Sequence, residues 1–579
     1  MHIGVLAKST ISSNAEHFRE AGSKLSFHPS NSQVSVLVLF INAALGRKNN
    51  GSSHEGLSWD GHGGGPANRR FAIGDDKINS ANIHTLREHC RLTYPGGLTS
   101  TPTTYRAERM AYFPTSNGLF VAVDYKSCET KWAINVTSIV LEYAPLTSDQ
   151  QLTNSPMSRT SPQIADDVLF FGTQSHALIV AVDRHSGKTL GFVQVNPHHM
   201  AAITMSPIIF DIKDGSGNAT IPVLFVGASS AEENAAALIP NYTCCSFVGN
   251  MVALTFDRAS GFTKLWDTPV IPPAISGPGK WAGAGIWGSQ PSVDLRHFDT
   301  IFVATGNTYS IPSELDHCQD NATATSADRL PSDIWQEAVI ALEARTGKAK
   351  WVRQLSPLDA WNVACIGEGN PNCPETPGPD ADFGMAPSYI LGDSDYDRDV
   401  LVVGQKNGVL YSLDSQNGDV IWATETGPGG VIGGLSWGLA VDRERVYFTN
   451  INGDQVTWQI QPSNQTTNSS AYGAANLRNG ALVWETIAKG PGQAYGPPSV
   501  VGDLVFTNQP SLFDFSTQSV VPSKGGIIAL HSATGEVALE KELDAPFHLG
   551  LAIQDQCLIF GTGYKTFKPT GSFYVMCVD

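Results

Sequence analysis

A short segment repeats seven times along the 579-residue chain, and this repeat restricts the fold more than any other feature. In each copy an apolar stretch ends near an Asp or another polar residue, a turn follows, and a second stretch often carries a Trp. Alternating apolar residues are typical of half-buried strands, and the glycine in most of the turns can adopt positive φ. The copies are residues 122–132, 181–191, 255–266, 341–351, 412–422, 474–484 and 529–539. Regular repeats of this kind indicate a propeller or a similar array.

Further apolar stretches, such as DVLFFGT and DVLVVGQ, lie upstream of the copies and complete units of about four strands. A unit of this kind is one blade of a propeller. The C-terminal residues 557–579 supply only part of an eighth unit, and residues 85–95 can add its outer strand. We therefore predict an all-β fold, a single eight-bladed β-propeller with W-type repeats over residues 48–579, with seven blades as the alternative. Helices should be few and short.

Residues 1–47 are expected to form a separate N-terminal segment. Within it, residues 34–45 (VSVLVLFINAAL) have the length of a signal-peptide core and precede small residues, although a buried strand is the alternative. Seven Asn-x-Ser/Thr sequons add weak support for secretion. We therefore expect a secreted or secretory-pathway glycoprotein. No apolar run is as long as a membrane-spanning helix, so no membrane span is predicted.

The charge balance limits the partners of this protein. The sequence has 37 Lys and Arg residues against 54 Asp and Glu residues, a formal net charge of −17. An acidic surface repels phosphate backbones, so nucleic acid is not a predicted partner. The nine cysteines form neither a haem-attachment motif nor a C-x-x-C pair, and we expect a disulfide between Cys365 and Cys373 within a Gly/Pro/Asn-rich loop. The sequence leaves the oligomeric state open.

Several longer motifs stand between the repeats. They include SRTSPQI (158–164), VGASSAEENAA (226–236), TCCSFVGNMVAL (243–254), WAGAGIWGSQPSVD (281–294), ATGNTYSIP (304–312) and GQKNGVLYSLD (404–414). Together with the A-x-D-x-x-T-G-x-x-x-W repeat, they resemble the quinoprotein dehydrogenases, whose propeller binds pyrroloquinoline quinone (PQQ), and in particular the polyvinyl-alcohol-dehydrogenase-like branch. The resemblance implies an oxidoreductase acting on CH–OH groups of a small molecule or polymer. It also implies PQQ at the propeller axis, Ca²⁺ beside it and a separate electron acceptor.

The resemblance further implies roles for individual residues. Glu232, with Glu233 as the alternative, and Asn307 match the family's cation ligands, and hard oxygen ligands of this kind suit Ca²⁺. Lys406 matches a lysine that faces the quinone oxygens. The remaining cofactor positions are Arg159, Thr204, Cys244, Cys245, Trp287 and Trp437. The two cysteines form either a vicinal disulfide or two separate thiols, and the two tryptophans could equally belong to blade cores.

The sequence departs from the family pattern in its catalytic residues. Asn362 stands directly after a Trp, where many members have the catalytic Asp, and an amide cannot act as a base. The available carboxylates are Asp359, Asp380 and Asp382, and the early Glu of the family is also replaced, within residues 97–102. Two alternatives therefore stay open. One is a cofactor-free propeller enzyme for a cyclisation or isomerisation in secondary metabolism, and the other is a non-catalytic binding propeller.

Overall fold

The computed structural model describes residues 58–75, 77–213, 220–318, 330–367, 369–392, 397–490, 492–514, 519–520, 524–564 and 571–579. The predicted signal segment at residues 34–45 lies outside these ranges, as do the sequons at Asn50, Asn218 and Asn321. In the described ranges, strands dominate and the helices are short.

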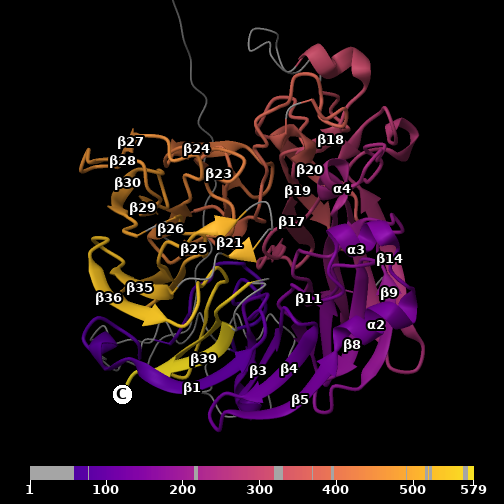
Figure 1. Ribbon diagram of the computed structural model, residues 1–579. Coiled ribbons are helices and arrows are strands. Elements are labelled where there is room, and N and C mark those ends of the chain that lie inside the picture. The colour runs from indigo at the N-terminus through magenta and orange to yellow at the C-terminus, as the bar shows by residue number, and fades with distance from the viewer. Residues whose placement is uncertain are drawn as a thin grey trace, which may run out of the picture. The chain divides into compact units, whose positions relative to one another are not determined.

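Eight antiparallel sheets follow one another along the described part of the chain, and each forms one blade (Figure 1). Blade 1 comprises β2 (Thr103–Tyr105), β3 (Met110–Pro114), β4 (Leu119–Asp124) and β5 (Glu129–Asn135). Blade 2 comprises β6 (Gln163–Ala165), β7 (Val168–Gly172), β8 (Leu178–Asp183) and β9 (Thr189–Gln194). Blade 3 comprises β11 (Ile208–Lys213), β12 (Thr220–Ser230), β13 (Asn250–Asp257) and β14 (Gly261–Pro269), and blade 4 comprises β16 (Ser292–Val293), β17 (Thr300–Ala304), β19 (Ala338–Glu343) and β20 (Ala349–Gln354).

The second half of the chain continues the same pattern. Blade 5 comprises β21 (Ser388–Ile390), β22 (Val400–Gly404), β23 (Val409–Asp414) and β24 (Val420–Glu425). Blade 6 comprises β25 (Ala440–Val441), β26 (Arg445–Asn450), β29 (Ala471–Asn476) and β30 (Leu482–Ile487), and blade 7 comprises β31 (Ser499–Val501), β32 (Leu504–Asn508), β35 (Gly525–His531) and β36 (Val537–Leu543). Blade 8 comprises β37 (Ala552–Gln554), β38 (Cys557–Gly561), β39 (Gly571–Cys577) and β1 (Arg87–Tyr94).

Strand β1 closes the ring of blades from the N-terminal side. It runs antiparallel to β39, with Arg91 opposite Tyr574, and the two strands lie side by side in Figure 1. The disulfide between Cys90 and Cys128 ties β1 to blade 1. Strand β1 thereby supplies the fourth strand of blade 8, which the C-terminal strands alone would leave with three. The predicted eight-bladed propeller, closed by a strand from residues 85–95, is thereby confirmed.

Tryptophans of the repeat join five of the blades, blades 1, 3, 4, 5 and 6, to the blade that follows each. The indole Nε1 of Trp132 donates a hydrogen bond to the carbonyl oxygen of Arg184 (2.9 Å), and that of Trp351 donates to Ser415 (3.1 Å). Equivalent bonds start from Trp266, Trp422 and Trp484. The facing turn glycine leaves room for the ring, because a Cβ at Gly418 would lie 2.6 Å from Trp351. The Trp series therefore stabilises the contacts between blades.

An irregular segment, residues 58–72, packs against the innermost strands of successive blades. The amides of Val293, Tyr389, Val441 and Val500, from β16, β21, β25 and β31, donate hydrogen bonds to the carbonyl oxygens of Pro66, Ala67, Arg69 and Arg70. The side chain of Arg70 is buried and donates to the carbonyl oxygens of Pro498 (2.7 Å) and Leu551 (3.3 Å). Burial lowers the pKa of Arg70 to about 9. The segment thus holds blades 4 to 7 together on their inner side.

Short helices and hairpins occupy the connections. The α-helices are α2 (Val136–Tyr143), α3 (Ser148–Thr153) and α4 (Glu232–Leu238). The 3-10 turns are η1 (Ile83–Thr85), η2 (Arg106–Glu108), η3 (Pro273–Ile275), η4 (Ser313–Cys318) and η6 (Val363–Ile366). Strand β10 (Ala201–Ala202) pairs with β12, and β15 (Ala282–Gly283) pairs with β18 (Thr308–Ser310) across the intervening β16 and β17. Two hairpins pair β27 (Trp458–Gln459) with β28 (Thr466–Thr467) and β33 (Phe513–Asp514) with β34 (Ser519–Val520). No helix in the described ranges is long and apolar enough to span a membrane.

Candidate functional site

Loops from blades 4 and 5 bring several of the candidate residues together. Asn307 lies between β17 and β18, Asp380 and Asp382 lie in the connection from β20 to β21, and Lys406 lies in the turn between β22 and β23. Consecutive strands of a blade are antiparallel, so these loops lie at the same end of their blades. The contacts between their side chains define the candidate site.

The Lys406 ammonium is buried between two carboxylates, and we call these three residues the lysine cluster. Its Nζ lies 2.9 Å from Asp380 Oδ2 and 3.1 Å from Asp382 Oδ2. The same atom lies 5.7 Å from the centre of the Trp287 ring. Burial alone would lower the pKa of Lys406, but the two carboxylates outweigh it and raise this pKa. Lys406 is therefore charged at neutral pH.

Around the lysine cluster, some oxygens are fully engaged and others are not. Asp382 accepts hydrogen bonds from the Asn307 amide (2.5 Å), from Trp287 Nε1 (3.2 Å) and from Lys406. Asn307 donates through Nδ2 to the carbonyl oxygen of Trp361 (2.8 Å). In contrast, Asn307 Oδ1 and Asp380 Oδ1 are buried and receive no hydrogen bond from any described residue. Buried acceptors without a partner are rare, so these two oxygens mark a place for a cation or for a donor group of a ligand.

The two adjacent glutamates at the start of α4 have different surroundings. Glu232 is fully buried and accepts hydrogen bonds from the amides of Ser246 (2.9 Å) and Phe247 (2.7 Å), so it holds the loop after the helix. Glu233 interacts with the lysine cluster instead. Burial and the negative charge of Asp382 raise the pKa of Glu233 to about 8, although Lys406 acts against them. The structure therefore brings Glu233, rather than Glu232, to the candidate site.

A second acidic pair lies next to the lysine cluster. Asp359 accepts hydrogen bonds from the amides of Ala381 (2.8 Å) and Asp380 (3.3 Å), so its carboxylate anchors the turn that carries the cluster's acids. Glu337 is fully buried, and burial and the negative charge of Asp359 raise its pKa well above the usual range. The sequence analysis did not single out Glu337. Its only signal is an acidic residue directly before a strand with buried apolar residues.

Two disulfides lie next to Asn362: the expected one between Cys365 and Cys373, and the vicinal one that the sequence left open. Cys244 and Cys245 form a disulfide, and a second disulfide closes the loop at residues 365–373. Asn362 joins the two, because its Nδ2 donates to the carbonyl oxygen of Asn372 (2.8 Å) and lies 3.8 Å from Cys244 Sγ. The side chain of Asn362 is therefore committed to holding this loop in place.

Aromatic residues form one wall of the site. The rings of Trp287 and Trp437 meet edge to face, with their centres 5.7 Å apart. The Arg159 guanidinium lies 5.9 Å from the centre of the Trp437 ring and 5.5 Å from that of Tyr564. Thr204 donates a hydrogen bond to the carbonyl oxygen of Trp287 (2.9 Å). The structure thus connects these four predicted residues to one another and, through Trp287, to Lys406.

The atoms of this site determine what it can bind. Carboxylate and amide oxygens predominate, which are the ligands that Ca²⁺ prefers. In the described ranges, no group of three or more His, Cys, Asp or Glu side chains is arranged to hold a metal ion. Asn307 Oδ1 and the Glu233 carboxylate are the candidate oxygen ligands for such an ion. Aromatic rings and the ammonium of Lys406 suit a flat, anionic organic molecule.

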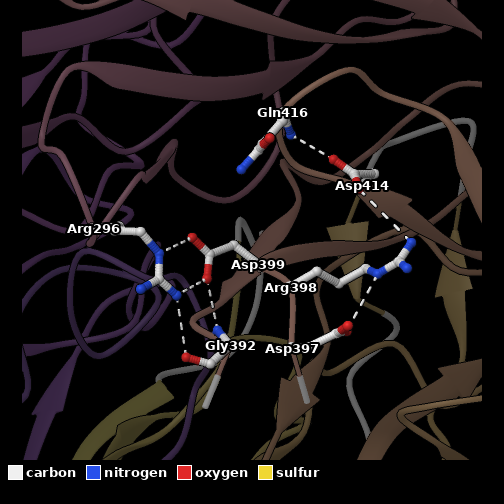
Figure 2. Close-up of a pocket in the computed structure, with 7 residues that line it drawn as sticks. All are labelled: Arg296, Gly392, Asp397, Arg398, Asp399, Asp414 and Gln416. Carbon is white, nitrogen blue, oxygen red and sulfur yellow. Dashed lines mark hydrogen bonds and ion pairs between the residues drawn. The ribbon is translucent and has the colours of Figure 1, made fainter. Parts of the chain in front are cut away.

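A separate open cavity of about 660 Å³ lies at the other end of blades 4 and 5 (Figure 2). Its lining residues are Arg296, Gly392, Asp397, Arg398, Asp399, Asp414 and Gln416, at the β16–β17, β21–β22 and β23–β24 connections. The charged groups are paired with one another. Arg296 Nε lies 2.6 Å from Asp399 Oδ2, and Arg398 lies between Asp397 and Asp414. We assign no role in the chemistry to this cavity.

Several known proteins have sequences similar to that of this chain. A family model described as outer membrane protein assembly factor BamB matches residues 336–541. A polyvinylalcohol dehydrogenase of Pseudomonas sp is 30% identical over 399 residues, which cover 67% of this chain and 54% of that protein. A second one, of Sphingopyxis sp. (strain 113P3), is 33% identical over 310 residues, or 50% of this chain and 42% of that protein. The chain belongs to the family of PQQ-dependent alcohol dehydrogenases.

Solved structures agree with the fold of this family. The quinohemoprotein alcohol dehydrogenase from Comamonas testosteroni superposes with a TM-score of 0.64 at 16% identity, over 94% of this chain and 84% of that chain. At this low identity the likeness supports the propeller fold alone. The chain spans about half the length of the curated relatives it matches. The activity of this family member therefore has to be argued from its own residues.

Proposed function

We propose that this protein oxidises alcohol groups with PQQ as its redox cofactor and a divalent cation beside it. The observation that carries the proposal is the pair of buried, unpartnered acceptor oxygens on Asn307 and Asp380, next to Lys406 and the Trp287 ring. A cation and an oxygen-rich aromatic cofactor are groups that would satisfy such a site. Family membership supports the same conclusion.

Each part of the site has a role in this proposal. Trp287 and Trp437 would hold the flat cofactor, and Arg159 and Lys406 would balance its negative charge. Asn307 Oδ1 and the Glu233 carboxylate would hold the cation, for which we propose Ca²⁺ because all of these donors are hard oxygens. When bound, PQQ supplies a quinone carbon that accepts hydride from the alcohol. The side chain of Asn362 is engaged in hydrogen bonds that hold the neighbouring loop. We propose that it supports this loop, whereas many relatives have the catalytic base at this position.

Among the candidate bases, Asp380 suits the chemistry best. A base needs a free oxygen within reach of the alcohol proton. Asp382 has three hydrogen-bond donors, and Asp359 is occupied by the amides of its neighbouring turn. Asp380 Oδ1 is unpartnered, while Oδ2 is held by Lys406. Burial and the negative charge of Asp382 raise the pKa of Asp380, while Lys406 acts against them and favours its ionised form. We therefore propose that Asp380 takes the proton of the alcohol and that Lys406 favours its ionised form and orients it.

We also propose that the protein is secreted and delivers its electrons to a separate acceptor. Four disulfides are typical of an oxidising compartment. The sequons at Asn135, Asn241, Asn464 and Asn468 are exposed and could carry glycans. The substrate would be an alcohol group of a small molecule or of a polymer.

Dye reduction in the presence of an alcohol panel tests the proposal on protein reconstituted with PQQ and Ca²⁺. We expect alcohol-dependent turnover, and a fall of about 100-fold or more in Asp380→Asn because a general base is lost. Asp397→Asn, at the distant cavity, is the matched control and should retain full turnover. Absence of alcohol-dependent turnover in the PQQ-loaded wild-type protein would contradict the proposal and favour cofactor-free chemistry. Full activity of Asp380→Asn would assign the base to another residue.

A further inference from the structure

We propose that Glu337 is a positioning residue: as a neutral carboxylic acid it donates a hydrogen bond to Asp359, which in turn holds the turn carrying Asp380 and Asp382. The inference rests on the proposed function, because it concerns how the acids of that site are oriented. Glu337 touches neither the lysine cluster nor the proposed cation ligands through any described hydrogen bond, so it acts through Asp359.

The backbone fixes Glu337 beside its partner. Its amide donates to the carbonyl oxygen of Gly306 (3.0 Å), and its carbonyl oxygen accepts from Leu355 (3.2 Å). Glu337 has a φ of +43°, a backbone conformation that is costly for any residue other than glycine. The preceding residue, Gln336, accepts a hydrogen bond from the Asp359 amide (3.2 Å). Residues 336 and 337 therefore hold Asp359 by both its backbone and its carboxylate.

The carboxyl group of Glu337 has the surroundings of a proton donor. It is fully buried, and apart from the Ser356 hydroxyl, which favours the ionised form, no described N–H or O–H group interacts with its oxygens. A buried carboxylate with so few donors is strongly disfavoured, and a second carboxylate beside it adds repulsion. Burial and the Asp359 charge accordingly raise the pKa of Glu337. Burial raises the pKa of Asp359 as well, and the hydrogen bond with Glu337 acts against burial and favours the ionised form of Asp359.

The effect reaches the site through two amides. The ionised Asp359 accepts from the amides of Asp380 and Ala381, and charged acceptors make the stronger hydrogen bonds. Asp380 has φ of +58°, so its conformation depends on these contacts. The Lys406 amide also donates to the Asp382 carbonyl oxygen (3.0 Å), which couples the turn to the lysine cluster. Loss of the Glu337 proton donor should therefore loosen the alignment of Asp380 with Lys406.

Two variants of Glu337 separate this role from simple packing. Glu337→Gln keeps a donor of the same size and should retain turnover within about twofold, whereas Glu337→Leu should lower kcat about 10- to 100-fold, the equivalent of one hydrogen bond to a charged group. The pH dependence of kcat should also shift in Glu337→Leu. Binding of PQQ to this variant should stay stoichiometric. The matched controls are Glu485→Gln and Glu485→Leu, because Glu485 is another buried carboxyl, in β30, with a pKa raised by burial to about 8. These controls should leave kcat and its pH profile unchanged.

Infrared spectroscopy tests the proton itself without any need for activity. The difference spectrum of wild type minus Glu337→Gln should contain the band of a protonated carboxyl group at neutral pH. Absence of this band would overturn the proposal, as would equal loss of kcat in the Gln and Leu variants or no loss in either. If the wild-type protein proves inactive with PQQ, the infrared result still decides whether Glu337 carries the proton, so the two proposals fail separately.

Discussion

Replacing Lys406 with Met should destabilise the protein more than the loss of any exposed ion pair. The substitution removes the ammonium that neutralises two buried carboxylates, whose side chains are only 2% and 6% exposed. Breaking a buried pair in this way costs about 3–5 kcal/mol in the free energy of unfolding. Burial already raises the pKa of Asp380 in the folded protein above its value in the unfolded chain, near 4, and loss of the Lys406 charge should raise this pKa further. The deficit should therefore be small in acid, where Asp380 is protonated in both proteins, and should grow as the pH rises through the range in which Asp380 ionises in the wild-type protein.

Urea denaturation of the two proteins at acidic and at slightly alkaline pH measures this difference. Lys264→Met is the matched control, because its Nζ lies 2.8 Å from Asp267 in a pair whose side chains are 46% and 34% exposed. The control should lose about 1 kcal/mol or less, with little dependence on pH. An equal loss in the two variants, or a Lys406→Met deficit that does not grow with pH, would refute the argument that Lys406 compensates the charge of buried carboxyl groups.

Three further outcomes follow from the packing. In urea denaturation, Gly418→Ala should lower the free energy of unfolding by about 1–3 kcal/mol more than Gly261→Ala. Both glycines have positive φ, but of the two only Gly418 faces a Trp ring. Equal losses would contradict the packing of the Trp ring between the blades. Burial raises the folded-state pKa of Glu485 to about 8, so the free energy of unfolding should fall as the pH rises from about 4 through 8. Glu485→Gln should remove this dependence when denaturation is measured at several pH values. The same pH profile in the variant and the wild type would contradict the raised pKa. Replacing Cys90 and Cys128 together with Ser should cost about 4 kcal/mol, since the disulfide spans 38 residues; an unchanged urea midpoint would show that ring closure does not need it.

The fold was predictable because its signal is local and repeated. Alternating apolar residues occur within each copy, and most copies also have a turn glycine and a tryptophan. The C-terminal residues supply only part of an eighth blade and residues 85–95 can complete it, which indicates how the ring closes. Residues 58–72 were harder to interpret, since a glycine-rich segment without apolar periodicity gives no sign that it packs against the innermost strands of four blades. Its role depends on partners more than two hundred residues away.

The site was only partly predictable. The motifs pointed to Asn307, Lys406 and Trp287, which the structure brings into contact with Asp382 or with one another. They could not separate Glu232 from Glu233, because adjacent residues on a helix point about 100° apart and only the tertiary structure decides which faces the site. Glu337 belongs to no motif, and its proposed role depends on its contact with Asp359, which is distant in the sequence.

Calorimetric titration of the protein with PQQ in the presence of Ca²⁺ tests the central claim most directly. The account predicts a single saturable site, with binding that weakens when Ca²⁺ is chelated and when Asn307 is replaced by Ala, since its free Oδ1 would be lost. Asp397→Asn, at the distant cavity, should bind as the wild type does. No binding at micromolar PQQ, or binding indifferent to both Ca²⁺ and Asn307→Ala, would contradict the assignment of this site to a quinone and a cation.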